Sequence, residues 1–312
     1  MSVLSAAHFH NEEAAYAYVE ARLWPQGPVC PHCGGFDRIG KMGGKSTRIG
    51  AYKCYQCRKP FTVKVGTIFE ASHVPLRHWL QVMFLMASSK KGISTNQIQR
   101  TLDCHMKTAW FIGHRIREAM RSGRLAPFGS DGGAVEVDET FIGREPGMPI
   151  KQGGFHKMKV LSLVERNSGQ VRSFVVDSIR TETLAPIISE NIAHEARLMT
   201  DEANQYKPIG KNYADHGVVN HTRDEYVSKD DPTIYTNTIE GVFSIFKRGM
   251  RGIYQHCDKR HLHRYLAEFD FRYSNRVALG INDVERADLI LTGVAGKRLT
   301  YRPTDGGSES VA

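Results

Sequence analysis

The chain has 312 residues, 41% hydrophobic and 24% charged, which is the composition of a water-soluble globular protein with material for two or three domains. Its longest apolar run, Trp79 to Ala87, is half of the roughly 18 residues that a membrane helix needs, so no membrane span is expected. The net charge of +9 belongs to the N-terminal part, because residues 1–125 hold 18 Lys and Arg against 7 Asp and Glu, whereas residues 126–312 hold 24 against 26. This segregation predicts a polyanion-binding module joined to a near-neutral body; a solvated basic surface is the alternative.

Residues 1–27 predict one amphipathic helix, over about 8–24, which ends before Pro25 and Pro28. The first eleven residues lack a basic segment followed by an apolar core. No signal peptide is therefore expected, and a cytoplasmic location is predicted.

Two Cys-x-x-Cys pairs follow, Cys30 with Cys33 and Cys54 with Cys57, separated by 20 residues. In a chain without a targeting sequence this spacing favours a metal site over disulfides. Each pair forms a knuckle that aims two thiolates at one ion, and two knuckles complete the tetrahedral site of a structural Zn²⁺. Residues 28–70 therefore predict a zinc ribbon. Such ribbons bind nucleic acid or protein, and the sequence does not choose between them.

Three helical patterns occupy residues 71–125. One runs from Pro75 to about Ala87, a second begins after Ser94 and ends at Leu102, and a third runs from Met106 to Met120. The last two, joined by a tight turn, predict a helix-turn-helix whose basic side chains lie near solvent and contact DNA, namely Lys107, Arg115 and Arg117. A plain helical hairpin is the alternative.

Residues 130–280 predict an α/β domain of the ribonuclease H type, with a mixed sheet and helices on both faces. Three strands are expected over 134–143, 159–165 and 171–176, with a hairpin turn between the last two. The expected order continues with a helix over 183–195, a strand over 196–200, a short strand over 217–219, a helix carrying Glu240 and a long helix over 258–275. Residues 281–312 are expected to be an extension whose end, from Thr304, is disordered.

Three carboxylates of this domain are placed for metal-dependent chemistry. Asp138 lies inside an apolar strand, Asp201 follows another strand, and Glu240 lies on a helix. Two divalent ions held by such oxygen ligands activate an attacking oxygen and stabilise the leaving one in a phosphoryl displacement, and Mg²⁺ or Mn²⁺ suits that task. The structural alternatives are an ion pair of Asp138 with a lysine, a helix cap at Asp201 and a solvated surface acid at Glu240.

The helix around Glu240 carries further polar candidates. Asn237, three residues before Glu240, and Lys247, seven residues after it, lie on nearly the same helical face. We expect Asn237 to supply or support a metal ligand and Lys247 to meet a phosphate. Arg248 and Arg251 add positive charge for contacts with DNA.

Several motifs together resemble the DDE transposases of bacterial insertion sequences, specifically the ISXO-type branch. The resemblance spans roughly residues 10–280 and rests on the four-cysteine ribbon, Val137–Gly143, Thr200–Glu202, Asn237–Gly241, His261–Leu266 and Phe271–Tyr273. It implies Asp138, Asp201 and Glu240 as the metal ligands, completed by Lys247.

One position departs from the pattern of these transposases. Related sequences often have a histidine just before the Thr236–Asn237 pair, where this chain has Tyr235. His221 is a candidate for a nearby functional histidine.

The activity implied by the resemblance is hydrolytic nicking at the ends of a transposable element, followed by attack of the freed 3′-hydroxyl on target DNA. The ribbon and the helix-turn-helix would bind the terminal inverted repeats, so double-stranded DNA is the expected partner and the nucleoid the expected place of action. Pairing of two ends implies a homodimer or a higher oligomer. The alternatives are a zinc-dependent DNA-binding regulator derived from a transposase, and a nuclease of the same fold without strand transfer.

Overall fold

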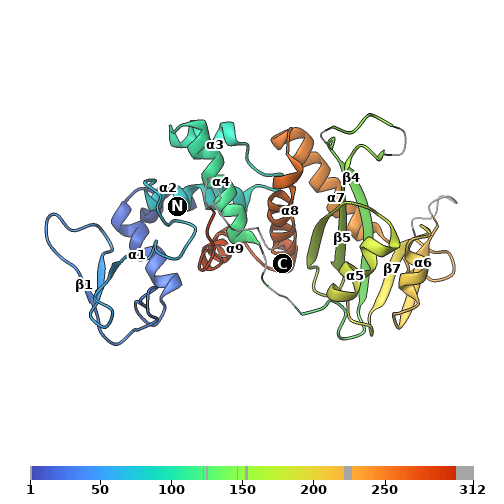
Figure 1. The fold of residues 1–312 in the computed structure, drawn as a ribbon, viewed down its shortest axis with the longest axis horizontal. Helices are drawn as coiled ribbons and strands as arrows, with labels where there is room; N and C mark the ends of the chain where they lie inside the picture. Colours follow the sequence, from blue (N-terminus) through green and yellow to red (C-terminus); the bar gives the residue numbers. More distant parts are fainter. Residues whose placement is uncertain are drawn as a thin grey trace. The chain divides into compact units, whose positions relative to one another are not determined.

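The computed structural model describes residues 2–121, 123, 126–145, 147–151, 154–220 and 227–299. The chain divides into two compact units, the first made of residues 1–89, 93–120 and those from Asn282 onward, the second of residues 90–92 and 121–281 (Figure 1). The predicted disorder from Thr304 and the candidate His221 lie outside the described residues. Within the described ranges, no helix combines the length and the apolar character needed to cross a lipid bilayer.

The cysteine-rich segment of the first unit folds as a small antiparallel sheet in the order β1-β2-β3, with β1 Ile39–Lys41, β2 Tyr52–Cys54 and β3 Pro60–Phe61. Gly34 and Arg58, which directly follow the two cysteine pairs, have φ angles of +74° and +64°. These left-handed residues turn the chain back after each pair. The apolar cluster beneath the sheet is small, and a fold of this size commonly depends on a metal for its stability.

Five helices complete the first unit: α1 Glu12–Leu23, α2 Leu76–Ser88, α3 Thr95–Leu102, α4 Met106–Met120 and α9 Asp283–Thr292. The helices predicted around residues 75–87, 94–102 and 106–120 are confirmed, and the Ser94 hydroxyl accepts a hydrogen bond from the Gln97 amide at 3.1 Å. The sequence did not predict α9, which packs against α1, α2 and α4. Its buried Arg286 donates to the carbonyl oxygen of Ala87, at 2.8 Å, and so ties α9 to the end of α2.

The second half of α4 is buried, and this corrects the expected exposure of two arginines. Arg115 and Arg117 are only 4% and 2% exposed. The Arg115 guanidinium donates to the carbonyl oxygens of Ile68 at 2.7 Å, Glu70 at 2.8 Å and Leu299 at 3.1 Å. Neither arginine belongs to the apolar stripe of α4. Other segments of the chain cover this part of the helix on further sides, so both arginines are buried. Lys107, in the first turn, is exposed as expected.

The second unit is built on a five-stranded mixed sheet in the order β6-β5-β4-β7-β8 (Figure 1). Its strands are β4 Ala134–Ile142, β5 Met158–Glu165, β6 Val171–Val176, β7 Arg197–Asp201 and β8 Asp215–Val219. The first three form an antiparallel meander, whereas β7 and β8 run parallel to β4. The predicted α/β architecture with a mixed sheet is confirmed.

Helices cover both faces of this sheet. Val135 and Val137 of β4 share a core cluster with residues of α5 (Thr181–Asn191) and α6 (Tyr206–Gly210). The opposite face packs against α7 (Asn237–Gly249), its π-helical continuation Met250–Tyr254, and α8 (Lys259–Ser274). Since side chains alternate along a strand, Glu136 and Asp138 belong to this second face.

One helix of the second unit is shorter than predicted. α5 ends at Asn191, four residues before the expected end. Ile192 has an extended backbone and forms a β-bridge with Phe128, and this tertiary pairing stops the helix.

Arg115→Ala is expected to lower the free energy of unfolding by about 2–4 kcal/mol, because the carbonyl oxygens that the guanidinium satisfies would lose a buried donor. Thermal unfolding followed by circular dichroism measures the effect. Lys107→Ala, at an exposed position of the same helix, is the control and should melt as the unaltered protein does. Equal melting of the two variants would contradict the structural role of Arg115.

Candidate functional site

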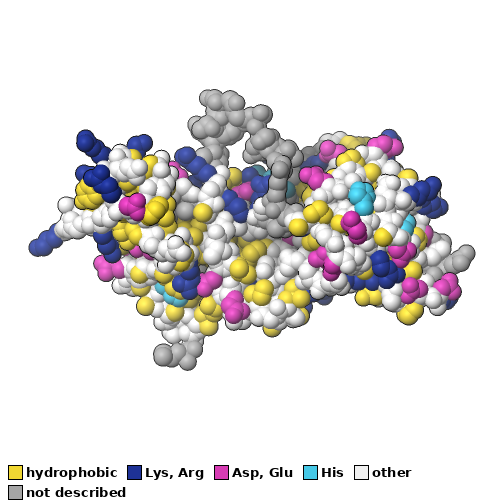
Figure 2. Space-filling model, turned by 90° about the horizontal axis from the view of Figure 1, so that it is seen from below, with side chains coloured by type: hydrophobic (Ala, Val, Ile, Leu, Met, Phe, Trp, Pro, Cys, Tyr) yellow, Lys and Arg dark blue, Asp and Glu magenta, His cyan; other side chains and the backbone are white. Residues whose placement is uncertain are grey.

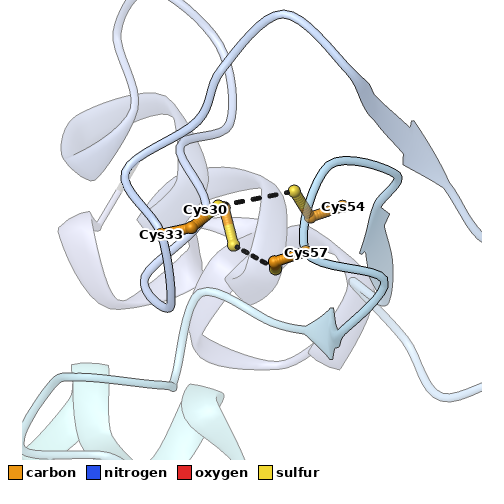
Figure 3. Close-up of side chains that lie close together, drawn as sticks. All are labelled: Cys30, Cys33, Cys54 and Cys57. Carbon is orange, nitrogen blue, oxygen red and sulfur yellow. Dashed lines mark hydrogen bonds between the residues drawn. The ribbon is translucent and has the colours of Figure 1, made fainter.

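The four cysteines converge on one point in the first unit (Figure 3). Their sulfur atoms all lie within 4.8 Å of one another, with 3.6 Å between Cys30 and Cys57 and 3.7 Å between Cys33 and Cys54. A tetrahedral ion with Zn–S bonds of about 2.3 Å requires sulfur–sulfur edges of about 3.8 Å. The cluster therefore has the dimensions and the ligand chemistry of a structural zinc site, as the spacing predicted.

Backbone hydrogen bonds shape the two knuckles of this cluster. The Gly34 amide donates to the Cys30 carbonyl at 2.9 Å, and the Cys54 amide donates to the Lys59 carbonyl at 3.1 Å. The amides of Cys57 and Gln56 point at the Cys54 sulfur and lower the pKa of that thiol to about 7, whereas burial and hydrogen bonds with the other thiols raise the pKa of Cys33 to about 12. Because zinc binds the thiolate form, Cys54 is the more readily ionised ligand of the two.

Asp138 and Asp201 lie on neighbouring parallel strands of the second unit. β4 and β7 pair with Ala134 opposite Arg197 and Glu136 opposite Met199. The pairing ends there, and Asp138 and Asp201 each lie two residues further along these strands. Although they are 63 positions apart in the sequence, the charge of Asp201 raises the pKa of Asp138.

Helix α7 brings Glu240 and Lys247 toward the same region. Burial raises the pKa of Asp138 well above its usual range, and the charges of Glu139, Asp201 and Glu240 raise it further. Burial and the charge of Arg251 lower the pKa of Lys247, and the charge of Asp138 opposes this shift. The three predicted carboxylates and the lysine thus act on one another electrostatically across the face of β4.

The acidic cluster is wider than the cysteine cluster. In the described part of the chain, the four cysteines form the one group of three or more such ligands whose atoms lie within 4.8 Å. One oxygen of Asp138 accepts from the Glu139 amide at 2.7 Å, and one oxygen of Asp201 accepts from the Ala203 amide at 3.0 Å. A carboxylate offers two oxygens, so one accepted hydrogen bond does not exclude a role as a metal ligand. Burial and like charges raise the pKa of Asp138, and a divalent cation bound there would favour its ionised form, so this donor set fits Mg²⁺ or Mn²⁺.

The other predicted site residues lie along α7 and its continuation. Asn237 is exposed in the first turn, and Arg248 and Arg251 are exposed near the far end. Tyr235 stacks against the Arg166 guanidinium, whose carbon lies 3.5 Å from the ring centroid. The Tyr235 side chain therefore makes a packing contact with Arg166.

Glu139 points to the opposite face of the sheet from Asp138, as strand alternation predicts. Its carboxylate accepts from the Gln205 side chain at 2.7 Å and from the Tyr206 hydroxyl. Burial raises the pKa of Glu139, and the charge of Asp201 adds to the increase. The charge of Glu139 raises the pKa of Asp138, while Gln205 and Tyr206 hold its carboxylate on the other face of the sheet.

The sequence pattern did not single out Glu136 or Arg166. Glu136 is 0% exposed, accepts from the Arg166 Nε atom at 2.7 Å, and accepts from the Ile239 amide at 2.9 Å. A glutamate between two valines of an apolar strand was the available signal, because an unpartnered carboxylate is costly there. Arg166 was assigned only to the hairpin turn.

Exposed basic side chains gather on the zinc ribbon. Figure 2 shows dark-blue Lys and Arg atoms around the end of the molecule that carries it. The exposed bases of the ribbon are Arg38, Lys41, Lys45, Arg48, Arg58 and Lys59. They account for much of the positive charge that the composition assigned to the N-terminal part.

Comparisons with known proteins find matches to both the ribbon and the second unit. Residues 131–274 match the family described as ISXO2-like transposase domain, and residues 10–60 match the transposase zinc-ribbon domain. A Halobacterium salinarum protein, described as an uncharacterized protein in transposable element ISH50, is 25% identical over 283 residues, which cover 85% of this chain and 91% of the relative.

The cysteine cluster is expected to hold one zinc per chain, measured by elemental analysis of the purified protein. Cys54→Ser should remove the metal and lower the melting temperature of the first unit, because zinc binding contributes directly to the stability of small ribbons. Cys104→Ser and Cys257→Ser, which alter cysteines outside the cluster, are the controls and should retain the metal. Full zinc content in Cys54→Ser would contradict the assignment.

Asp138→Asn is expected to stabilise the protein at pH 7 in buffer without added divalent ions, because burial and the neighbouring carboxylates disfavour the ionised form of Asp138. The folded-state pKa of Asp138 lies above its ordinary value of 3.8, so the native carboxyl retains its proton more strongly than the unfolded one. Native stability therefore falls as pH rises from about 3.8 to the folded pKa, and the asparagine variant escapes this loss.

Chemical denaturation at several pH values measures this difference. The advantage of the variant should shrink as the pH falls toward 3.8. Glu190→Gln, which removes an exposed acid of α5, is the control. A variant less stable than the unaltered protein at pH 7 would show that Asp138 is not destabilised by its neighbours.

Proposed function

We propose that this chain, which carries an ISXO2-like transposase domain and a transposase zinc-ribbon domain, cuts and joins DNA at the acidic site of its second unit. The observation that supports the proposal most is the placement of Asp138 and Asp201 on the adjacent parallel strands β4 and β7, where the charges of Asp201 and Glu240 both raise the pKa of Asp138. The strand order β6-β5-β4-β7-β8, with the β5 strand antiparallel to its neighbours, supports a ribonuclease H-like assignment for this unit.

The proposed reaction has two displacements at phosphorus. Water first attacks a phosphodiester at the end of the element, and the 3′-oxygen leaves as a hydroxyl. That hydroxyl then attacks a phosphodiester of the target, forming a new bond to phosphorus while the target 3′-oxygen leaves with a proton. When bound, two divalent ions activate the attacking oxygen and stabilise the leaving one.

The residues of the site divide this work by their chemistry. Asp138, Asp201 and Glu240 would hold the ions through carboxylate oxygens, with Asn237 supporting them. The Lys247 ammonium would contact a phosphate oxygen of the DNA, because it lies near enough to Asp138 for the Asp138 charge to affect the pKa of Lys247. Arg248 and Arg251 would neutralise neighbouring phosphates.

The first unit is proposed to bind double-stranded DNA at the terminal inverted repeats. The exposed bases of the ribbon suit phosphate contacts, which carry most of the affinity and make it dependent on salt. α3 and α4 meet at Asp103, whose φ of +48° makes the tight turn expected of a helix-turn-helix. The exposed first turn of α4, with Lys107, is the part that such a motif presents to bases. Two ends joined in one event require a homodimer or a larger assembly.

Asp138→Asn is expected to abolish Mg²⁺-dependent strand transfer, a loss on the order of 10³-fold or more for a group that supports transition-state charge. The assay joins DNA carrying the inverted repeats that flank the gene to a plasmid target. Retained binding of the end DNA and cooperative unfolding establish that the variant is folded. Full activity of this variant would end the catalytic assignment.

The same assay separates the alternatives. Products that are cut but never joined identify a nuclease. Binding of end DNA by the unaltered protein, with no cutting under any divalent ion, identifies a DNA-binding regulator.

A further inference from the structure

Glu136 and Arg166 form a buried ion pair under the start of α7. The Glu136 carboxylate is 0% exposed and lies 2.7 Å from the Arg166 Nε atom. Neither residue is a proposed metal ligand. Their side chains are 0% and 13% exposed, for Glu136 and Arg166, which leaves little surface for direct contact with DNA. Their partners indicate what they do.

The second carboxylate oxygen of Glu136 caps α7. It accepts from the amide of Ile239, the third residue of the helix, at 2.9 Å. In most helices the residue just before the first turn supplies this acceptor from its own side chain. Here the preceding residue, Thr236, makes no side-chain cap bond. The cap of α7 therefore comes from a strand about a hundred residues earlier in the sequence.

Arg166 holds the segment that leads into α7. Its two terminal nitrogens donate to the carbonyl oxygens of Thr233 and Tyr235, at 2.6 and 2.5 Å, and its plane stacks on the Tyr235 ring. Its own backbone amide donates to the Ala134 carbonyl at 3.0 Å, which anchors the residue to β4. One guanidinium thus connects β4 to the chain entering the helix.

The position of this pair relative to the acidic site has a mechanistic consequence. Glu136 and Asp138 lie on the same face of β4, about 6.6 Å apart along the strand. Ile239 and Glu240 are consecutive in α7, so the bond from Glu136 to the Ile239 amide sets where Glu240 stands relative to Asp138. Metal affinity depends strongly on how well such outer contacts orient the ligands.

We propose that Glu136, with Arg166, is a positioning residue that holds α7 so that Glu240 meets Asp138 and Asp201 across a metal ion. This inference rests on the proposed function of the acidic site. The structural basis is that β4 carries both the cap of α7, at Glu136, and a proposed metal ligand two residues later, at Asp138.

The test uses full-length Glu136→Gln and Arg166→Lys, with two readouts that do not require catalysis. Hydrogen exchange of the α7 first-turn amides is expected to quicken in both variants relative to amides of β5. Mn²⁺ affinity, measured by electron paramagnetic resonance, is expected to weaken about tenfold, the lower end of the range for residues that orient metal ligands. Arg166→Lys keeps a positive charge beside Glu136 but loses the two hydrogen bonds to the carbonyl oxygens of Thr233 and Tyr235. It therefore tests the link between β4 and the start of α7 even if Glu136→Gln unfolds.

A matched control comes from another buried ion pair of the same unit. Glu268, also 0% exposed, pairs with Arg272 within α8. Its carboxylate also accepts from Tyr254, in the continuation of α7 and far along the chain from the first turn of that helix. Glu268→Gln is expected to lower the melting temperature and to leave Mn²⁺ affinity and the exchange of the α7 first-turn amides unchanged. Unchanged exchange and affinity in the Glu136 and Arg166 variants, or equal losses in Glu268→Gln, would overturn the proposal.

Failure of the proposed function itself has a different signature. If Asp138→Asn binds Mn²⁺ as tightly as the unaltered protein, the acidic site is not a metal site. The exchange measurement still decides whether Glu136 holds the start of α7 in that case.

Discussion

The alternation of side chains along β4 is the constraint on which the second unit depends. Val135 and Val137 enter the core against α5 and α6, which leaves the intervening Glu136 and Asp138 to face α7. A shift of one residue in this strand would bury the acids in the apolar layer and turn the valines toward the site. The apolar core and the acidic site are therefore two consequences of a single register.

The two candidate metal sites differ in how the protein prepares them. The cysteine cluster is compact, and its sulfur atoms already have the spacing of a tetrahedral site. Among the described residues the carboxylates form no such close group, and burial together with the charges of Glu139, Asp201 and Glu240 raises the pKa of Asp138. A structural zinc site gains from closure, whereas the proposed cutting site would need room for a phosphate beside its ions.

Periodicity predicted most elements because each follows from local chemistry. The Ser94 cap, the bounds of α4 and the three-stranded meander needed only neighbouring residues. The exposure of Arg115 and Arg117 was wrong because an apolar stripe describes one face of a helix, not what covers the others. α9 was overlooked because its packing against α1 and α2 involves residues more than a hundred positions away.

The sequence by itself indicated the candidate ligand types: four thiols at knuckle spacing, and three acids, one inside an apolar run, one at the end of another and one on a helix. These predictions need no coordinates because ligand chemistry and strand or helix period are properties of short segments. Only the tertiary structure decided which segments lie together. Parallel pairing of β4 with β7 put the strands of Asp138 and Asp201 side by side, and the bond from Glu136 to Ile239 placed the start of α7. Such contacts depend on the register between distant segments, which no single segment encodes.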